Sequence, residues 1–147
     1  MAFLRDDPRL EFNSLQSISG LDQKDCVEIV YHVYSMPKKH RAVVKASSPR
    51  ANGSVPTVAH LWKTAIWLER ETYDMFGVKF SGNPDLRRIL CPDDWEGWPL
   101  LRDYKVQEFY LGMPVPYHAE HWVGDGTFVK KLDDVSAETL EQWYQVG

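Results

Sequence analysis

An alternating run of β-branched and aromatic residues over Cys26–Ser35 constrains the fold most strongly. In an extended chain every second side chain points to the same face, and residues of these kinds favour strands. One face carries Val27, Ile29, Tyr31 and Val33, and the other carries Glu28, Val30, His32 and Tyr34. Met36–Lys39 favours a hairpin turn, so His40–Ala46 is predicted as the returning strand.

The segment before this hairpin predicts a third strand of the same sheet. Its apolar residues are Leu10, Phe12, Leu15 and Ile18. Their spacing predicts one face of a short helix that runs into a strand near residues 15–19. Gly20 and Asp22 then favour a turn into the hairpin. Together the three strands predict a small antiparallel meander.

A long helical pattern follows the hairpin. Ser54 is a favourable N-cap, and Pro56 is tolerated in a first turn. Apolar residues then recur at helical spacing over Val58–Phe76, and this length leaves room for a break near Lys63–Ala65. Gly77 stands where a helix commonly ends.

The remaining chain predicts short extended pieces and loops. Val78–Phe80 predicts a short strand, Leu86–Cys91 a strand or an extended segment, and Pro92–Pro99 a loop. Residues 105–147 predict an extended tail that wraps a partner and is not ordered in isolation, with a capped helix from Ser136 to about Tyr144. The prediction is therefore an α+β domain over residues 1–104, with a small antiparallel or mixed sheet packed against one or two helices, followed by this tail.

Charged residues of the predicted helix stand beside aromatic ones. Arg70 and Asp74 are spaced to pair along the helix. Glu69 and Glu71 lie about 200° apart around a helix axis, so they do not serve one paired-carboxylate site. We expect one glutamate to point inward and meet an arginine of the next segment. A solvated helix face is the alternative explanation of these charges.

Two consecutive arginines, Arg87 and Arg88, follow the next turn. Arginine binds carboxylates in a bidentate way and tolerates partial burial. We expect one of them to pair with a helix carboxylate at position 69, 71 or 74 and so to tie the loop to the helix. Ordinary surface charge is the alternative here.

Composition excludes several kinds of function. A net charge of −4 argues against nucleic acid as the main partner, and no apolar run reaches the roughly 20 residues of a membrane helix. The N-terminus lacks the apolar core of a signal peptide, which predicts a protein of the cytosolic side. The two cysteines, Cys26 and Cys91, are too few for an ordinary iron–sulfur cluster and are predicted to be buried free thiols.

No catalytic, cofactor-binding or metal-ligating residue is predicted. The sequence has no phosphate-binding glycine loop and no hydrolase or zinc-protease motif. His118 and His121 form an HxxH pair without a convincing third ligand. His60 is predicted as a structural residue of the helix.

Three stretches resemble one known family. They are Trp67–Phe80 (WLERETYDMFGVKF), Gly82–Leu90 (GNPDLRRIL) and Asp94–Tyr104 (DWEGWPLLRDY). Together they closely resemble the C subunit of the respiratory NADH–quinone oxidoreductases, the 30 kDa subunit family of complex I. A weaker resemblance extends back to about Phe12. The family usually has other residues at four of these positions, which here are Asn83, Trp98, Leu101 and Arg102.

The resemblance implies an α+β subunit that binds no redox centre and has no activity of its own. FMN, the iron–sulfur clusters and quinone belong to partner subunits, and the whole complex passes electrons from NADH to quinone and translocates ions. The implied place is peripheral, on the cytoplasmic face of the membrane, against the quinone-site subunit and the subunit with the terminal iron–sulfur cluster. The implied structural and interface residues are Glu69, Arg70, Glu71, Asp74, Phe76, Gly77, Pro84, Arg87, Arg88, Trp95, Arg102, Asp103 and Tyr104.

Two alternatives remain open at this point. The equivalent subunit of a membrane-bound hydrogenase or formate hydrogenlyase complex shares the motif. A free-standing enzyme would instead use Asp74, Glu69 and His60 in a pocket, with a strongly shifted carboxyl pKa.

Overall fold

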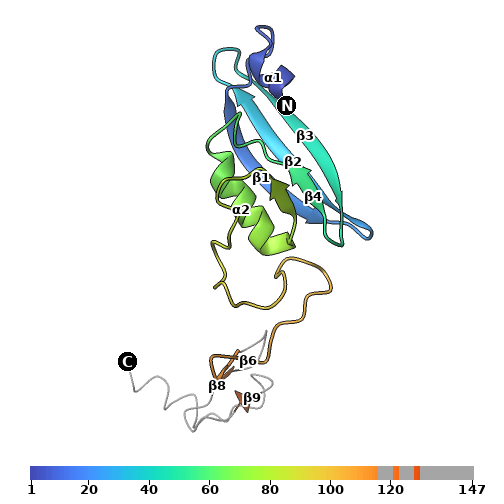
Figure 1. Ribbon diagram of the computed structural model, residues 1–147, viewed down its shortest axis with the longest axis vertical. Helices are drawn as coiled ribbons and strands as arrows, with labels where there is room; N and C mark the ends of the chain where they lie inside the picture. Colours follow the sequence, from blue (N-terminus) through green and yellow to red (C-terminus); the bar gives the residue numbers. More distant parts are fainter. Residues whose placement is uncertain (116–120, 123–127, 130–147) are drawn as a thin grey trace, which may run out of the picture. The chain divides into compact units, whose positions relative to one another are not determined.

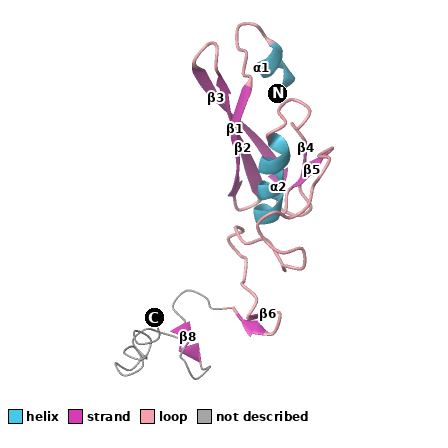
Figure 2. Ribbon diagram, turned by 90° about the vertical axis from the view of Figure 1, so that its left-hand side faces the viewer, coloured by secondary structure: helices cyan, strands magenta, loops and turns pink. Residues whose placement is uncertain are grey.

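A computed structural model of the protein describes residues 1–115, 121–122 and 128–129 (Figure 1). The chain divides into two compact units, Met1–Lys105 and Val106–Gly147, and each is described by itself. The first unit combines small sheets with helices, which confirms the predicted α+β class (Figure 2). Its elements are α1 (Ala2–Asp6), β1 (Ser14–Asp22), β2 (Cys26–Ser35), β3 (His40–Pro49), β4 (Ser54–Pro56), α2 (Ala65–Phe76) and β5 (Lys79–Ser81).

The larger sheet is the predicted antiparallel meander. Its order is β1-β2-β3, and β2 has the predicted bounds. β3 runs on to Pro49, beyond the predicted end at Ala46. The four side chains predicted to share one face of β2 are at most 3% exposed and form the middle of the core: Val27, Ile29, Tyr31 and Val33. Figure 2 shows α2, β4 and β5 together on one side of this sheet.

A β-bulge explains the helix-like pattern at the start of the sheet. The register between β1 and β2 shifts between Leu15 and Ser17, so Gln16 is an extra residue. Leu15 and Ile18 are therefore both buried, although in a regular strand their spacing would send them to opposite faces. The helix predicted to lead into this strand is wrong. A short helix does occur near the N-terminus, but it is α1, earlier in the chain.

The turn predicted at Gly20 and Asp22 is also wrong, because both residues continue β1. The chain turns over residues 23–25 instead. Gly20 lies against the ring of Phe76, and a Cβ at this position would be 2.4 Å from the Cδ2 atom of that ring. α2 thus approaches β1 as closely as a glycine allows. Asp22 is buried at the end of the strand, where its carboxylate meets other segments.

The predicted helix is shorter at its start. α2 begins at Ala65, where the pattern leaves room for a break. The N-cap predicted at Ser54 and the first turn predicted at Pro56 are wrong, because Ser54–Pro56 is β4 and pairs in parallel with β5. The hydroxyl oxygens of Ser54 and Ser81 lie 2.7 Å apart across this pair. The partner strand lies beyond the helix in sequence, so a local pattern does not indicate it.

Gly77 ends α2 as predicted. Its φ of 77° is left-handed, and its N–H donates to the carbonyl of Tyr73 at 2.8 Å. The short strand predicted at Val78–Phe80 is confirmed as β5, which begins at Lys79. The direct return from α2 to β5 places the next segment of chain beside the helix end.

The segment after β5 contains no strand over Leu86–Cys91, and Pro92–Pro99 is a loop as predicted. The described part of the second unit contains two short antiparallel pairs. They are β6 (Phe109–Tyr110) with β7 (Met113–Pro114), and β8 (His121–Trp122) with β9 (Phe128–Val129). The helix predicted from Ser136 to Tyr144 lies outside the described residues, as does His118.

Candidate functional site

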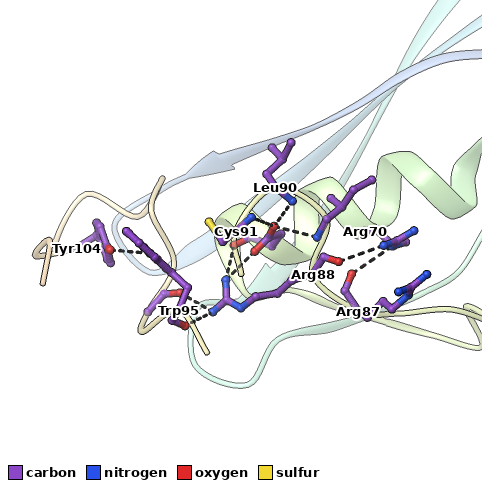
Figure 3. A network of polar contacts seen from close by, with 10 residues as sticks. Arg70, Arg87, Arg88, Leu90, Cys91, Trp95 and Tyr104 are labelled. Carbon is purple, nitrogen blue, oxygen red and sulfur yellow. Dashed lines mark hydrogen bonds and ion pairs between the residues drawn. The ribbon is translucent and has the colours of Figure 1, made fainter. Parts of the chain in front are cut away.

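The carboxylate of Asp74, near the end of α2, is the centre of a polar network. Asp74 is 0% exposed. Its Oδ2 accepts the backbone N–H groups of Ile89, Leu90 and Cys91 at 3.1, 2.7 and 2.8 Å. Its Oδ1 accepts a hydrogen bond from Arg88 at 2.6 Å. Figure 3 shows how Arg88, Leu90 and Cys91 gather at the end of the helix. An irregular stretch of backbone is thus satisfied by one side chain.

The guanidinium of Arg88 has several partners. Beyond its bond to Asp74, its Nη2 donates to the carbonyls of Trp95 and Gly97 at 2.9 and 2.8 Å. Its guanidinium carbon lies 4.5 Å from the ring centre of Trp98, a cation–π contact. The predicted pairing of a loop arginine with a helix carboxylate is confirmed at Arg88. Because this arginine is largely buried, the surface-charge alternative is wrong for it.

Opposing effects act on the pKa of Asp74. Burial raises it, whereas the N–H of Cys91, the guanidinium of Arg88 and the next two backbone N–H groups lower it. The lowering effects prevail, so the pKa of Asp74 lies below its ordinary value. The buried carboxylate therefore stays charged, and its four hydrogen bonds compensate for the loss of water.

Arg70 anchors the same stretch of backbone from the preceding turn of α2. Its Nε and Nη2 donate to the carbonyls of Arg87 and Arg88 at 3.2 and 3.0 Å, as Figure 3 shows. Its Nη1 lies 3.4 Å from the carboxylate of Asp85. The pairing predicted between Arg70 and Asp74 is therefore wrong. Main-chain carbonyls and a loop carboxylate occupy the guanidinium instead.

Glu69 is a second buried carboxylate of α2 and belongs to a different network. It is 0% exposed and accepts hydrogen bonds from the hydroxyl of Thr57, the amide of Asn83 and the N–H of Val58 at 2.6, 2.7 and 2.8 Å. The prediction of an inward glutamate is confirmed, but its expected arginine partner is wrong, because neutral donors satisfy it. Burial, followed by the negative charge of Glu69, raises the pKa of Tyr31 to about 12.

Further contacts fix the end of the same segment. The indole N–H of Trp95 donates to the hydroxyl of Tyr104 at 2.9 Å (Figure 3). The carboxylate of Asp22 accepts the N–H of Arg102 at 2.8 Å and the guanidinium of Arg50 at 3.0 Å. We refer to residues 83–104, which all these contacts hold, as the clasp segment. It is anchored to α2, to β1 and to the loop after β3.

The other predicted site residues have different surroundings. Phe76 packs in the core, and Gly77 ends α2 with its Cα close to the ring of Trp98. The solvated-face explanation holds for Glu71 but not for the buried charges of α2. The predicted residues with exposed side chains are Glu71, Pro84, Arg87, Arg102 and Asp103. Of these, Arg87 pairs with Asp85, and Asp103 pairs with Arg50.

Two groups of anchoring residues were missed from the sequence. Asp22 and Arg50 hold the end of the clasp segment, and Thr57 holds Glu69. The bond from Arg102 to Asp22 joins residues 80 positions apart, so no local spacing marks it. Trp98 stands out in the sequence only as a departure from the family pattern, although its ring covers Arg88.

The buried charged side chains of this arrangement bind the chain's own backbone. Within the described residues, no three His, Cys, Asp or Glu side chains gather as a metal site. The enzyme pocket considered above is not formed, because Glu69 and Asp74 are buried in separate networks and His60 is exposed ahead of α2. Cys26 and Cys91 are free thiols as predicted, but half-buried. None of the described helices has the length and apolar content that crossing a membrane requires.

Large apolar side chains stay exposed around the anchored backbone. Trp67, Leu90 and Leu100 are 59%, 63% and 55% exposed. Both leucines donate backbone N–H groups to the end of α2, Leu90 to Asp74 at 2.7 Å and Leu100 to the carbonyl of Met75 at 3.1 Å. Their side chains are therefore presented by a fixed main chain. Exposed apolar side chains that gather on a surface mark protein–protein contact sites.

Comparison with known proteins identifies related chains. The family described as "Respiratory-chain NADH dehydrogenase, 30 Kd subunit" matches residues 1–110. The NADH-quinone oxidoreductase C subunit of Chlorobium phaeobacteroides is 55% identical over 118 residues, which are 78% of this chain and 71% of the relative. The proteins of the same name from Chloroherpeton thalassium and Geobacter sulfurreducens are 49% and 45% identical, over 78% and 67% of this chain and 49% and 63% of their own length. The chain thus spans 49% to 71% of the length of these relatives.

A solved structure contains a chain of similar fold. It is described as "Structure of the membrane-bound sulfane sulfur reductase (MBS), an archaeal respiratory membrane complex". The similar chain is 29% identical, with a TM-score of 0.58, over 71% of this chain and 67% of that chain.

Replacement of Glu69 by glutamine tests whether this buried side chain must be a carboxylate. All three of its partners are donors, so the amide group of Glu69→Gln would face a donor and leave buried groups unsatisfied. We expect the free energy of unfolding to fall by about 1–3 kcal/mol in urea titrations. Glu71→Gln, on the exposed face of the same helix, is the control and should change it by less than about 0.5 kcal/mol. Equal effects of the two changes would contradict this account of Glu69.

The pH dependence of stability tests the charge of Asp74. Its pKa in the folded protein is depressed, so its contribution is present above about pH 4 and is lost as the pH falls through the folded-state pKa. We expect Asp74→Asn to be less stable than the wild type by about 3–5 kcal/mol near neutral pH. This deficit should shrink as the pH falls below about 4 towards the folded-state pKa of Asp74, where the wild type loses the same charge.

The measurement is urea unfolding at a series of pH values. Asp93→Asn, an exposed aspartate of the clasp segment, is the matched control and should remain close to the wild type throughout. A deficit for Asp74→Asn that stays constant down to about pH 2 would show that the charge of Asp74 does not stabilise the fold.

Proposed function

Because the chain belongs to the respiratory-chain NADH dehydrogenase 30 Kd subunit family, we propose that it is a peripheral, non-catalytic subunit of an NADH–quinone oxidoreductase. Other subunits of that assembly carry electrons from NADH through FMN and iron–sulfur centres to quinone. This chain scaffolds the quinone-site subunit and the subunit with the terminal cluster. It binds no cofactor and is held at the cytoplasmic face of the membrane through the complex.

The names of the relatives support this assignment over the hydrogenase alternative. The relatives described above are all named as the C subunit of an NADH-quinone oxidoreductase. The similar chain of the archaeal complex supports the idea that this fold serves in membrane-bound respiratory assemblies. The two free cysteines also support a role without a redox centre in this chain, because an ordinary cluster needs more thiolates.

The anchored clasp segment is the observation that carries the scaffolding proposal. A segment without helix or strand would normally lose conformational freedom when it binds a partner, and this loss weakens the complex. Here Asp74, Arg70 and Asp22 fix its backbone within the chain itself. Leu90 and Leu100 are therefore already in place for contact, and less entropy is lost on assembly.

Co-expression with the candidate partners tests the proposal. We expect the chain to form a stoichiometric complex with the quinone-site and terminal-cluster subunits from its own genome, seen by size-exclusion chromatography with light scattering. Leu90→Asp and Leu100→Asp should each weaken this complex by at least about tenfold, because they place a charge in an apolar contact. Both leucine side chains are more than half exposed, so the isolated variants should keep the melting temperature of the wild type.

Met36→Asp is the matched control, because Met36 is an apolar residue that is 59% exposed in the turn between β2 and β3, outside the clasp segment. It should assemble as the wild type does. A chain that stays monomeric beside both candidate subunits would overturn the proposed function. Assembly that ignores both leucine changes would exclude the clasp segment as the contact.

A further inference from the structure

The two outer edges of the three-stranded sheet differ in how well they are protected. Edge strands expose unpaired backbone groups that can pair with another chain. β1 is protected by the bulge at Gln16, by the packing of α2 against it, and by the contacts of Asp22 with Arg50 and Arg102. Features of this kind are common means of blocking an edge.

β3 is protected less along its length, although β4 contacts it and it carries the exposed charges of Arg41 and Lys45. It is the outermost strand of its sheet in Figure 1, and no described strand pairs with its far side. Its pairing with β2 continues without a register shift from His40 to Pro49. Proline, which would block pairing, occurs only at the last of these positions. Alternate backbone N–H and C=O groups of this long regular strand therefore point away from the sheet.

An open groove lies beneath this edge. The inner face of β3 carries Ala42, Val44 and Ala46, which are only half-buried although their partners on β2 are fully buried. The side chains of Val44 and Ala46 line a groove of about 490 Å³ together with Val55 and Leu61. Ser54, Thr57 and His60 also line the groove, and its mostly small side chains leave space for those of an added strand.

The outer face of β3 is basic. Arg41 and Lys45 are exposed on it. Lys45 pairs with Glu28 at 2.9 Å, whereas Arg41 has no ion-pair partner among the described residues. An added strand would place every second side chain beside these two cations and the others over the groove.

We propose that the free edge of β3 binds an extended segment of a different polypeptide chain, with apolar residues over the groove and acidic residues beside Arg41 and Lys45. Main-chain hydrogen bonds supply affinity in this mode of binding, and alternate side chains supply specificity. The inference rests on the proposed function, since the segment belongs to another subunit of the same assembly. It concerns a surface separate from the clasp segment.

Charge complementarity favours a different chain over a second copy. Two β3 edges paired antiparallel about a two-fold axis would bring like charges together. The two-fold axis of such a pair passes through one residue of β3. For each choice of this residue from 41 to 45, Arg41 or Lys45 lies opposite or diagonal to a like charge of the other copy. A strand with acidic residues on that face avoids this repulsion.

Site-specific photo-cross-linking in the assembled complex tests the inference. Benzoylphenylalanine is introduced singly at Val43 and Ser47 of the full chain, and the complex is purified, irradiated and analysed by mass spectrometry. We expect both positions to cross-link one short peptide of another subunit, with attachment points that follow in order along it. Benzoylphenylalanine at Gln16, the exposed bulge residue of the protected β1, should give a yield at least about tenfold lower.

The charges are tested in the same complex. The double change Arg41→Glu with Lys45→Glu should lower the cross-linking yield at Val43 by at least about tenfold. An unchanged melting temperature of the double variant shows that the fold is kept. If the cross-linking yield at Val43 is unchanged in the double variant, the inference that the partner segment is acidic is wrong.

The outcomes separate this inference from the proposed function. If the complex assembles but the β3 positions give no ordered cross-links, the inference is wrong and the proposed function stands. Cross-links to a second copy of this chain would also overturn the inference. A chain that purifies with no other subunit would overturn both.

Discussion

The buried ion pair between Asp74 and Arg88 is the interaction on which the clasp segment depends. Removing two charges from water is costly unless each finds enough partners. Asp74 accepts three backbone N–H groups besides the guanidinium. Arg88 also donates to the backbone carbonyls of Asp74, Trp95 and Gly97 and lies over the ring of Trp98. Each charge therefore organises backbone that no helix or strand organises. The segment between Asn83 and Tyr104 has a defined course because these two side chains replace a regular hydrogen-bond ladder.

α2 connects this network to the rest of the first unit. Glu69 and Asp74 are five positions apart and so face about 140° away from each other around the helix. Glu69 binds the chain after β4 and the turn after β5, whereas Asp74 binds the clasp segment. The two buried carboxylates of α2 thus fix neighbouring segments of the chain on two sides of the helix. The exposed Leu90 and Leu100 owe their fixed positions to this arrangement, which links the packing of α2 to the proposed role in assembly.

The parts of the fold that follow local rules were predictable, and those that depend on distant partners were not. The alternation over β2 and the helix end at Gly77 depend on residues that are close in sequence, so both were predicted correctly. β4 was mistaken for a helix start because β5, its strand partner among the described residues, lies beyond α2. The bulge at Gln16 gave two buried residues a helical spacing. In the site, the pairing of a loop arginine with a helix carboxylate was predicted from the chemistry of these groups. The spacing of Arg70 and Asp74 gave a wrong pairing, because distant loop carbonyls bind the guanidinium of Arg70.

Native-state amide hydrogen exchange at residues 89–91 tests most directly whether Asp74 orders the clasp segment. These amides donate to its carboxylate, and residues 89–91 belong to no helix or strand in the described part of the chain. In Asp74→Ala, compared with the wild type, their protection should fall by a much larger factor than that of the β2 amides, which report global unfolding. A fall by the same factor at both places would contradict the account, because the loss would then be one of overall stability and not of local order.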